Sequence, residues 1–117
     1  MFVCNRLLFA TLRAVCANGK MEKVLFSDVL PFDDKKNAFF GEENDYWYDD
    51  SHVEVCTDVL LNDGFLFERN GFIYPSIPSI GFIDYCVEYD FKVPYDVPFV
   101  FFVKKALKNA SENFIGE

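Results

Sequence analysis

Residues 83–93, IDYCVEYDFKV, carry the most regular pattern in the chain. Apolar and aromatic side chains occupy the odd-numbered positions, whereas charged side chains and Cys86 occupy the even-numbered ones. Such alternation predicts a strand of an antiparallel sheet with one buried face and one hydrated face. We therefore expect Val87→Asp to destabilise the domain by several kcal/mol, through a buried unpaired charge, and Glu88→Ala to change little.

Three other segments are predicted to form strands. Residues 22–30, EKVLFSDVL, are predicted to be a strand closed by Pro31, and residues 52–61 alternate valine and leucine with polar side chains. Residues 65–76, FLFERNGFIYPS, predict a hairpin, because Asn-Gly at 70–71 favours a type I′ turn. That register pairs Arg69 with Phe72 and Phe67 with Tyr74.

Two segments are predicted to form helices. Residues 5–17 combine good helix formers with Asn5 as a cap and an Asn-Gly end, although the same Asn-Gly pair also fits a hairpin turn. A second helix is expected to open near Pro98, with Phe99 and Val103 on its apolar face. The resulting fold class is α+β: one domain, residues 1–117, with an antiparallel sheet of four to five strands and both helices packed on one face.

The charge of the chain is strongly negative and unevenly placed. The net charge is −8, and residues 33–58 hold nine acidic and two basic side chains, net −7. Such a field repels nucleic acid and anionic membranes and attracts cationic partners. We therefore expect a protein partner with a basic surface, no direct nucleic-acid binding and no membrane binding.

Residues 33–51 have no usable periodicity and are predicted to be a long acidic and aromatic loop. Carboxylates supply charge there, and tyrosines supply rigid area of the kind favoured at binding hot spots. We expect Trp47 to point inward and both neighbouring tyrosines to be more exposed. Reversing the charge of four loop carboxylates is expected to leave stability intact. The candidate partner-binding residues of the loop are Glu42, Glu43, Asp45, Tyr46, Tyr48, Asp49 and Asp50.

A second acidic surface is expected on the sheet. If the strands at 52–61 and 82–93 are neighbours, their polar faces form two rows of carboxylates spaced about 7 Å apart along each strand. That spacing is close to the separation of successive phosphates on one nucleic-acid strand. The rows would thus imitate a nucleic-acid backbone. Their members are Glu54, Asp58, Asp84, Glu88 and Asp90.

Metal binding and catalysis are not expected. His52, Glu54, Cys56 and Asp58 would share one strand face, but ligands about 7 Å apart on a strand do not converge on one ion. The chain has one histidine and lacks hydrolase, nucleotide-binding and zinc-protease motifs. We expect no metal, no cofactor and no enzyme activity.

The cysteines and the apolar runs indicate a cytoplasmic protein. No two of the four cysteines form a C-x-x-C pair, so we expect four free thiols and no disulfide. No run is long enough to span a membrane, and the apolar run that Arg13 interrupts is too short for a secretion signal.

Three functions fit this description. The first is a small non-catalytic inhibitor that blocks a basic, nucleic-acid-binding surface of a partner, in the manner of phage anti-defence or toxin-immunity proteins. The second is a structural or viral assembly subunit that self-associates through a sheet edge or an aromatic surface into a homo-oligomer. The third is a small enzyme or ligand-binding domain with a pocket under residues 33–51.

Overall fold

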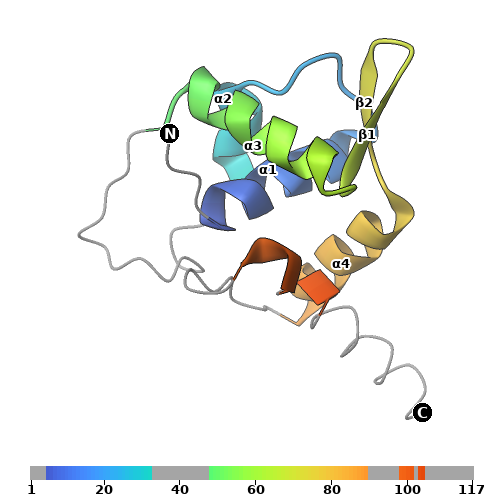
Figure 1. Cartoon of the computed structure of the whole chain (residues 1–117). Helices are drawn as coiled ribbons and strands as arrows, with labels where there is room; N and C mark the ends of the chain where they lie inside the picture. Colours follow the sequence, from blue (N-terminus) through green and yellow to red (C-terminus); the bar gives the residue numbers. More distant parts are fainter. Residues whose placement is uncertain (1–4, 33–47, 90–97, 102, 105–117) are drawn as a thin grey trace.

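The computed structural model describes residues 5–32, 48–89, 98–101, 103 and 104. This part of the chain is mostly helical and contains a two-stranded antiparallel sheet (Figure 1). Residues 99–101, 103 and 104 are helical as well. The elements in chain order are α1 (Asn5–Asn18), α2 (Phe26–Val29), the 3-10 turn η1 (Leu30–Phe32), α3 (Asp50–Asn62), β1 (Leu66–Arg69), β2 (Phe72–Pro75) and α4 (Ile77–Glu88).

The predicted sheet of four to five strands is wrong, because three of the predicted strands are not strands. Residues 52–61 belong to α3, and residues 83–88 belong to α4. Residues 22–25 form an irregular connection, which is followed by the short helix α2 and by Leu30, the first residue of η1. The fold is still α+β, but helices rather than strands supply most of its buried surface.

Helix α3 forms because its buried side chains follow a helical period. Val53, Cys56, Thr57 and Leu60 are buried, at spacings of three, four and seven residues from the first. By contrast Val55, which the strand prediction placed beside Val53, is only half-buried. The alternating valines and polar residues therefore lie in a helix, and only the helix face that carries the four buried residues reaches the core.

Helix α4 overturns the strand that was predicted at 83–93. Ser76 caps this helix by accepting the backbone N–H of Ser79 at 3.3 Å, and a proline lies in its first turn. Cys86 is buried, whereas Val87 is 49% exposed, the reverse of the predicted alternation. The buried positions recur with helical spacing instead: Ser79, Phe82, Ile83 and Cys86. Residues 90–93 of the predicted strand lie outside the described residues.

The N-terminal helix is confirmed. α1 begins at Asn5 and ends at Asn18, and the following Gly19 adopts a left-handed φ of 79°. The Gly19 N–H donates to the Val15 carbonyl at 2.8 Å, which closes the last turn. The Asn-Gly pair thus ends a helix and does not turn a hairpin.

The predicted hairpin is confirmed in position and register. Arg69 pairs with Phe72, and Phe67 pairs with Tyr74. Asn70 and Gly71 both have positive φ, 54° and 80°, as a type I′ turn requires. The register also directs alternate side chains to opposite sides of the hairpin, and this alternation shapes the candidate site.

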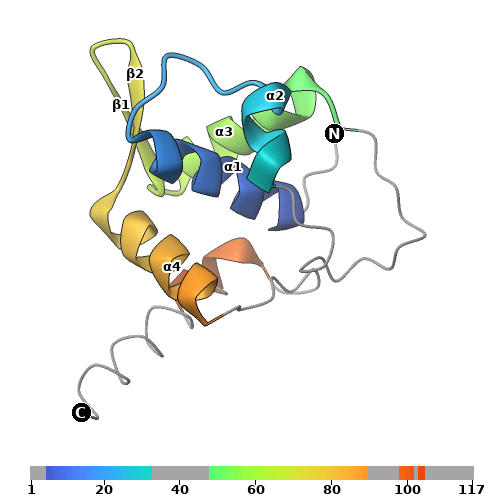
Figure 2. The same cartoon turned by 180° about the vertical axis from the view of Figure 1, so that it is seen from behind.

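The core is built around α1. Two views show α3 and α2 on one side of α1, and α4 with the helical residues 99–101, 103 and 104 on the other side (Figures 1 and 2). Phe82 of α4 is fully buried and meets the rings of Phe9 and Phe99 edge-on, at centroid distances of 5.8 and 6.0 Å. Phe99 and Val103 are buried, as predicted for the second helix, whose later residues lie outside the described part of the chain.

Replacing Thr11 by valine is expected to stabilise the protein. Thr11 of α1 is fully buried, and among the described residues its Oγ1 has no hydrogen-bond partner. A buried unsatisfied polar atom costs about 1–3 kcal/mol, and valine has nearly the same shape without the hydroxyl. We expect Thr11→Val to raise the free energy of unfolding by about 1 kcal/mol, measured by urea denaturation.

Thr57→Val is the matched control. Thr57 is also a buried helical threonine, but its Oγ1 donates to the Val53 carbonyl at 2.8 Å. Removing a satisfied hydroxyl should give no gain. An equal gain at both positions would show that burial of any threonine is unfavourable here, regardless of its hydrogen bonds.

Candidate functional site

A groove of about 160 Å³ lies between α3, the connection after α1 and the hairpin. It is lined by four carboxylates and one ammonium group, and we call it the acidic groove. Its walls combine carboxylates with an apolar floor. The lining residues are Glu22, Lys23, Val24, Glu54, Thr57, Asp58, Leu61, Glu68 and Ile73.

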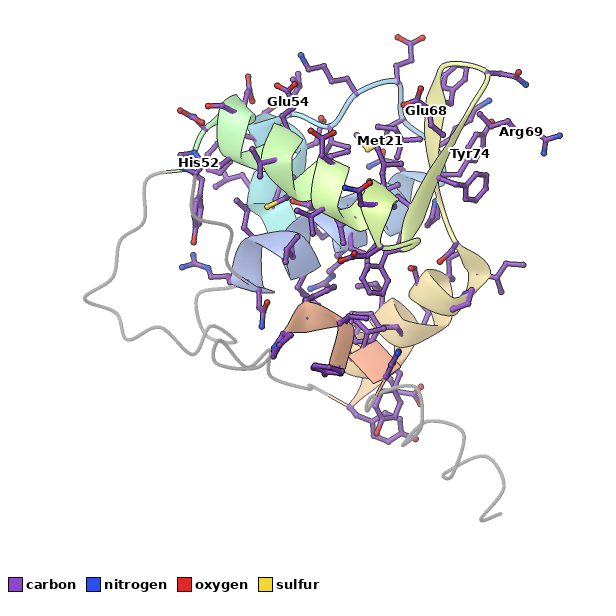
Figure 3. The ribbon with its side chains drawn as sticks, viewed as in Figure 1. Met21, His52, Glu54, Glu68, Arg69 and Tyr74 are labelled. Carbon is purple, nitrogen blue, oxygen red and sulfur yellow. The ribbon has the colours of Figure 1, made fainter. Side chains whose placement is uncertain are left out.

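Secondary structure places a carboxylate on each wall. Glu54 and Asp58 are four residues apart on α3, so they share one exposed face of that helix. Glu68 lies opposite Ile73 in the hairpin and points toward Met21, whereas Arg69 and Tyr74 point to the other side (Figure 3).

Glu22 reaches the groove because the chain before it is tied to the hairpin. Met21 exchanges two backbone hydrogen bonds with Ile73, at 3.0 and 2.6 Å. This bridge aligns the connection alongside β2 and brings Glu22, Lys23 and Val24 to the groove. Three segments that are distant in sequence thus converge on one site.

The groove has uncompensated negative charge over an apolar floor. Four carboxylates and the ammonium of Lys23 give it a formal charge of −3. Within the described residues, none of the four carboxylates forms an ion pair or a side-chain hydrogen bond. Val24 and Ile73, which also line the groove, are buried, whereas the four carboxylates are exposed. Such a surface suits a ligand with an apolar stem and a cationic head.

Two of the predicted binding carboxylates have structural roles at the start of α3. Asp49 caps the helix: its Oδ1 accepts the N–H of Ser51 at 3.0 Å and of His52 at 3.2 Å, and the Ser51 hydroxyl at 2.6 Å. Asp50 accepts the Phe26 N–H at 2.8 Å and so ties α3 to α2. The expected neutrality of charge reversal therefore does not hold at these two positions.

Tyr48 is also part of this junction, and whether it is more exposed than Trp47 remains a prediction, because Trp47 lies outside the described residues. The side chain is half-buried, because its ring lies against Phe26 and His52, at centroid distances of 6.5 and 5.9 Å. The Arg6 guanidinium lies 5.8 Å from the ring centroid. Tyr48 therefore anchors the chain that enters α3.

The cap makes stability depend on the charge of Asp49. Hydrogen bonds from Ser51 first, and then from His52, lower the pKa of Asp49 from 3.8 to about 2. Since the folded-state pKa is depressed, the stabilisation is present above about pH 4 and is lost as pH falls toward 2.

Asp49→Asn should remove this pH dependence and keep the cap, because asparagine also caps helices. Wild type is expected to be more stable than the variant near pH 5, and the difference should vanish near pH 2. Thermal unfolding followed by circular dichroism across this range measures it. Parallel curves would contradict the role of the Asp49 charge.

The two predicted carboxylate rows do not form, because their strands are helices. Glu54 and Asp58 lie on α3 in the acidic groove, whereas Asp84 and Glu88 lie on α4, on the other side of α1 (Figure 1). The remaining candidates lie outside the described residues: Glu42, Glu43, Asp45, Tyr46 and Asp90. Trp47 lies there too, as do residues 33–47 of the segment under which a pocket was expected.

Two of the described thiols and the histidine are held in environments set by the fold. Burial raises the pKa of Cys16 and of Cys86 to about 12, with Asp84 adding to the shift at Cys16, so neither thiol is appreciably ionised at neutral pH. His52 is held at the helix cap by Asp49. In the described ranges, no three His, Cys, Asp or Glu residues are placed to hold a metal ion together.

Two further properties complete the description of the chain. Cys16 and Cys86 are free thiols, while Cys4 lies outside the described residues, so four free thiols remain a prediction. No helix in the described ranges has both the length and the apolar composition needed to cross a bilayer.

Sequence reasoning missed two of the four groove carboxylates, Glu22 and Glu68. The predicted hairpin register held a signal for Glu68, because it places this residue on the same side as Leu66 and Ile73. No local sequence pattern identifies Glu22 as a residue of the groove.

Comparison with known proteins gave no match to a family model, to a curated protein or to a solved structure.

Proposed function

We propose that this chain is a small non-catalytic binding protein that docks onto a basic surface of another protein and blocks it. The observation that supports the proposal is the acidic groove, where three segments bring together four carboxylates that have no ionic partner among the described residues. The net charge of −8 adds a long-range field of the same sign. Such a field accelerates association with a basic partner by about 10 to 1,000-fold.

Nucleic-acid-binding proteins are the proposed class of partner. Their binding surfaces collect lysine and arginine to contact phosphates, and a blocking protein would compete for the same side chains. The imitation of regularly spaced phosphates is not part of this proposal, since the carboxylate rows on which it depended are absent. What remains is complementarity of charge and shape at one groove.

The salt dependence of association tests the proposal. The partner would be captured from the native host, and association and dissociation rates measured at about 0.01 M and about 1 M salt, where the Debye length falls from about 30 to about 3 Å. We expect association to slow by at least an order of magnitude, with a smaller change in dissociation. An association rate unchanged by salt would overturn the proposal.

Self-assembly is the second candidate, favoured by a stacked ring pair on the hairpin whose Phe67 member is exposed. Phe67 is 46% exposed and stacks on Tyr74, with centroids 5.3 Å apart. Rings of this kind anchor protein interfaces. Sedimentation at rising protein concentration tests this function: a dimer that Phe67→Ser dissociates, and that high salt leaves intact, would favour assembly over charge-steered blocking.

A further inference from the structure

We infer that the acidic groove receives a single arginine side chain of the partner. The inference rests on the proposed function, since it names the group that the partner presents. It draws on three features of the groove: its volume, its apolar floor and the distribution of its carboxylates.

The volume of the groove matches one long side chain. An apolar cavity of about 150 Å³ can hold a molecule the size of benzene. The groove, at about 160 Å³, thus has room for a planar guanidinium and part of its stem. It is too small for a folded element of a partner, which would need to spread over the surrounding surface.

The apolar floor of the groove favours a ligand with a long apolar stem. Val24, Leu61 and Ile73 line the groove and are buried or half-buried, whereas its four carboxylates are exposed. Arginine buries its methylene stem along apolar surface and keeps its charged head among polar groups. A small inorganic cation would leave this floor uncovered.

The carboxylates of the groove favour a guanidinium as the cationic head group of the ligand. Glu54 and Asp58 stand on the α3 wall, and Glu68 stands on the hairpin wall. A guanidinium has five N–H donors in a planar fork, and it can therefore bond to carboxylates on more than one side. Arginine is also more weakly hydrated than lysine, so it loses less on leaving water.

Two competing occupants fit less well. A metal ion needs several ligands close together, and no such group of three exists among the described residues. Arg69 of the same chain points to the opposite side of the hairpin, away from Glu68 (Figure 3). An incoming arginine satisfies both the charge and the shape of the groove.

N-acetyl-arginine amide is the probe that tests this inference. It would be titrated into the full-length protein while the methyl resonances of Val24, Leu61 and Ile73 are followed by NMR. We expect saturable shifts at these methyls, with a dissociation constant on the order of 1 mM for so small a ligand. The double variant Glu54→Gln/Asp58→Asn should bind at least tenfold more weakly, and Glu68→Gln should also weaken binding.

Two control ligands separate the contribution of the cationic charge from that of the apolar stem, and arginine from lysine. N-acetyl-norleucine amide has the apolar stem without the cation, and equal shifts with it would overturn the inference. Equal or tighter binding of N-acetyl-lysine amide would overturn the assignment to arginine. Because no partner is used, this experiment fails independently of the proposed function. Arginine binding together with a salt-independent partner association would reject the proposed function alone.

Discussion

Phe82→Ala is expected to lower the free energy of unfolding by about 3–5 kcal/mol. Phe82 is fully buried in α4, and its ring is packed edge-on against Phe9 of α1 and against Phe99. Truncation would leave a cavity at the point where α4 packs against α1 and Phe99. The loss is therefore expected to reach a large fraction of the stability of a domain of this size.

Val87→Asp on the same helix is the informative control for this prediction. Val87 is 49% exposed, so its substitution should change stability by only about 0.5 kcal/mol. A strand at 83–93 would instead make Val87→Asp severely destabilising. Urea denaturation of both variants distinguishes the two structures, and a large loss at Val87 would contradict the helix.

Two local sequence signals correctly predicted α1 and the hairpin, because each signal specifies the point where the helix ends or the hairpin turns. Asn18-Gly19 ends α1 because glycine adopts the left-handed conformation at the helix end, and Asn70-Gly71 turns the hairpin for a related reason. In both cases the backbone geometry is determined by two residues. No packing against distant parts of the chain has to be known.

The helices α3 and α4 could not be identified from alternation because several patterns overlap in them. Val53 begins both an alternating series and a helical series, and only the second continues through Cys56 and Leu60 into the core. Valine favours strands, but propensity is weak beside tertiary packing. A capping side chain precedes each helix, Asp49 before α3 and Ser76 before α4, and these two caps were the overlooked signals.

Two of the four carboxylates of the acidic groove were predicted from the sequence as binding residues. Glu54 and Asp58 were named for their charge, and they share a face in a helix as they would in a strand, since positions four residues apart align in both. Glu22 and Glu68 were missed because they reach the groove only through the Met21–Ile73 bridge and the fold of the hairpin. A groove made by three segments depends on tertiary contacts that no local pattern records.

Reversing two groove charges, Glu54→Lys with Asp58→Lys, should slow association with the partner by at least an order of magnitude at low salt. The substitutions change the groove from −3 to +1 without altering a buried side chain. The two positions still carry like charges four residues apart, so helix stability should stay nearly constant. The loss is therefore expected in association, where electrostatic steering acts.

Asp84→Lys with Glu88→Lys on α4 is the matched control for this reversal. It changes the net charge of the protein by the same four units, but on exposed positions on the other side of α1. Measured at low and high salt, the groove variant should lose much more than the control at low salt, and the gap should narrow as salt screens the field. Equal slowing by both variants would mean that net charge alone steers the encounter, and the acidic groove would then not be the docking surface.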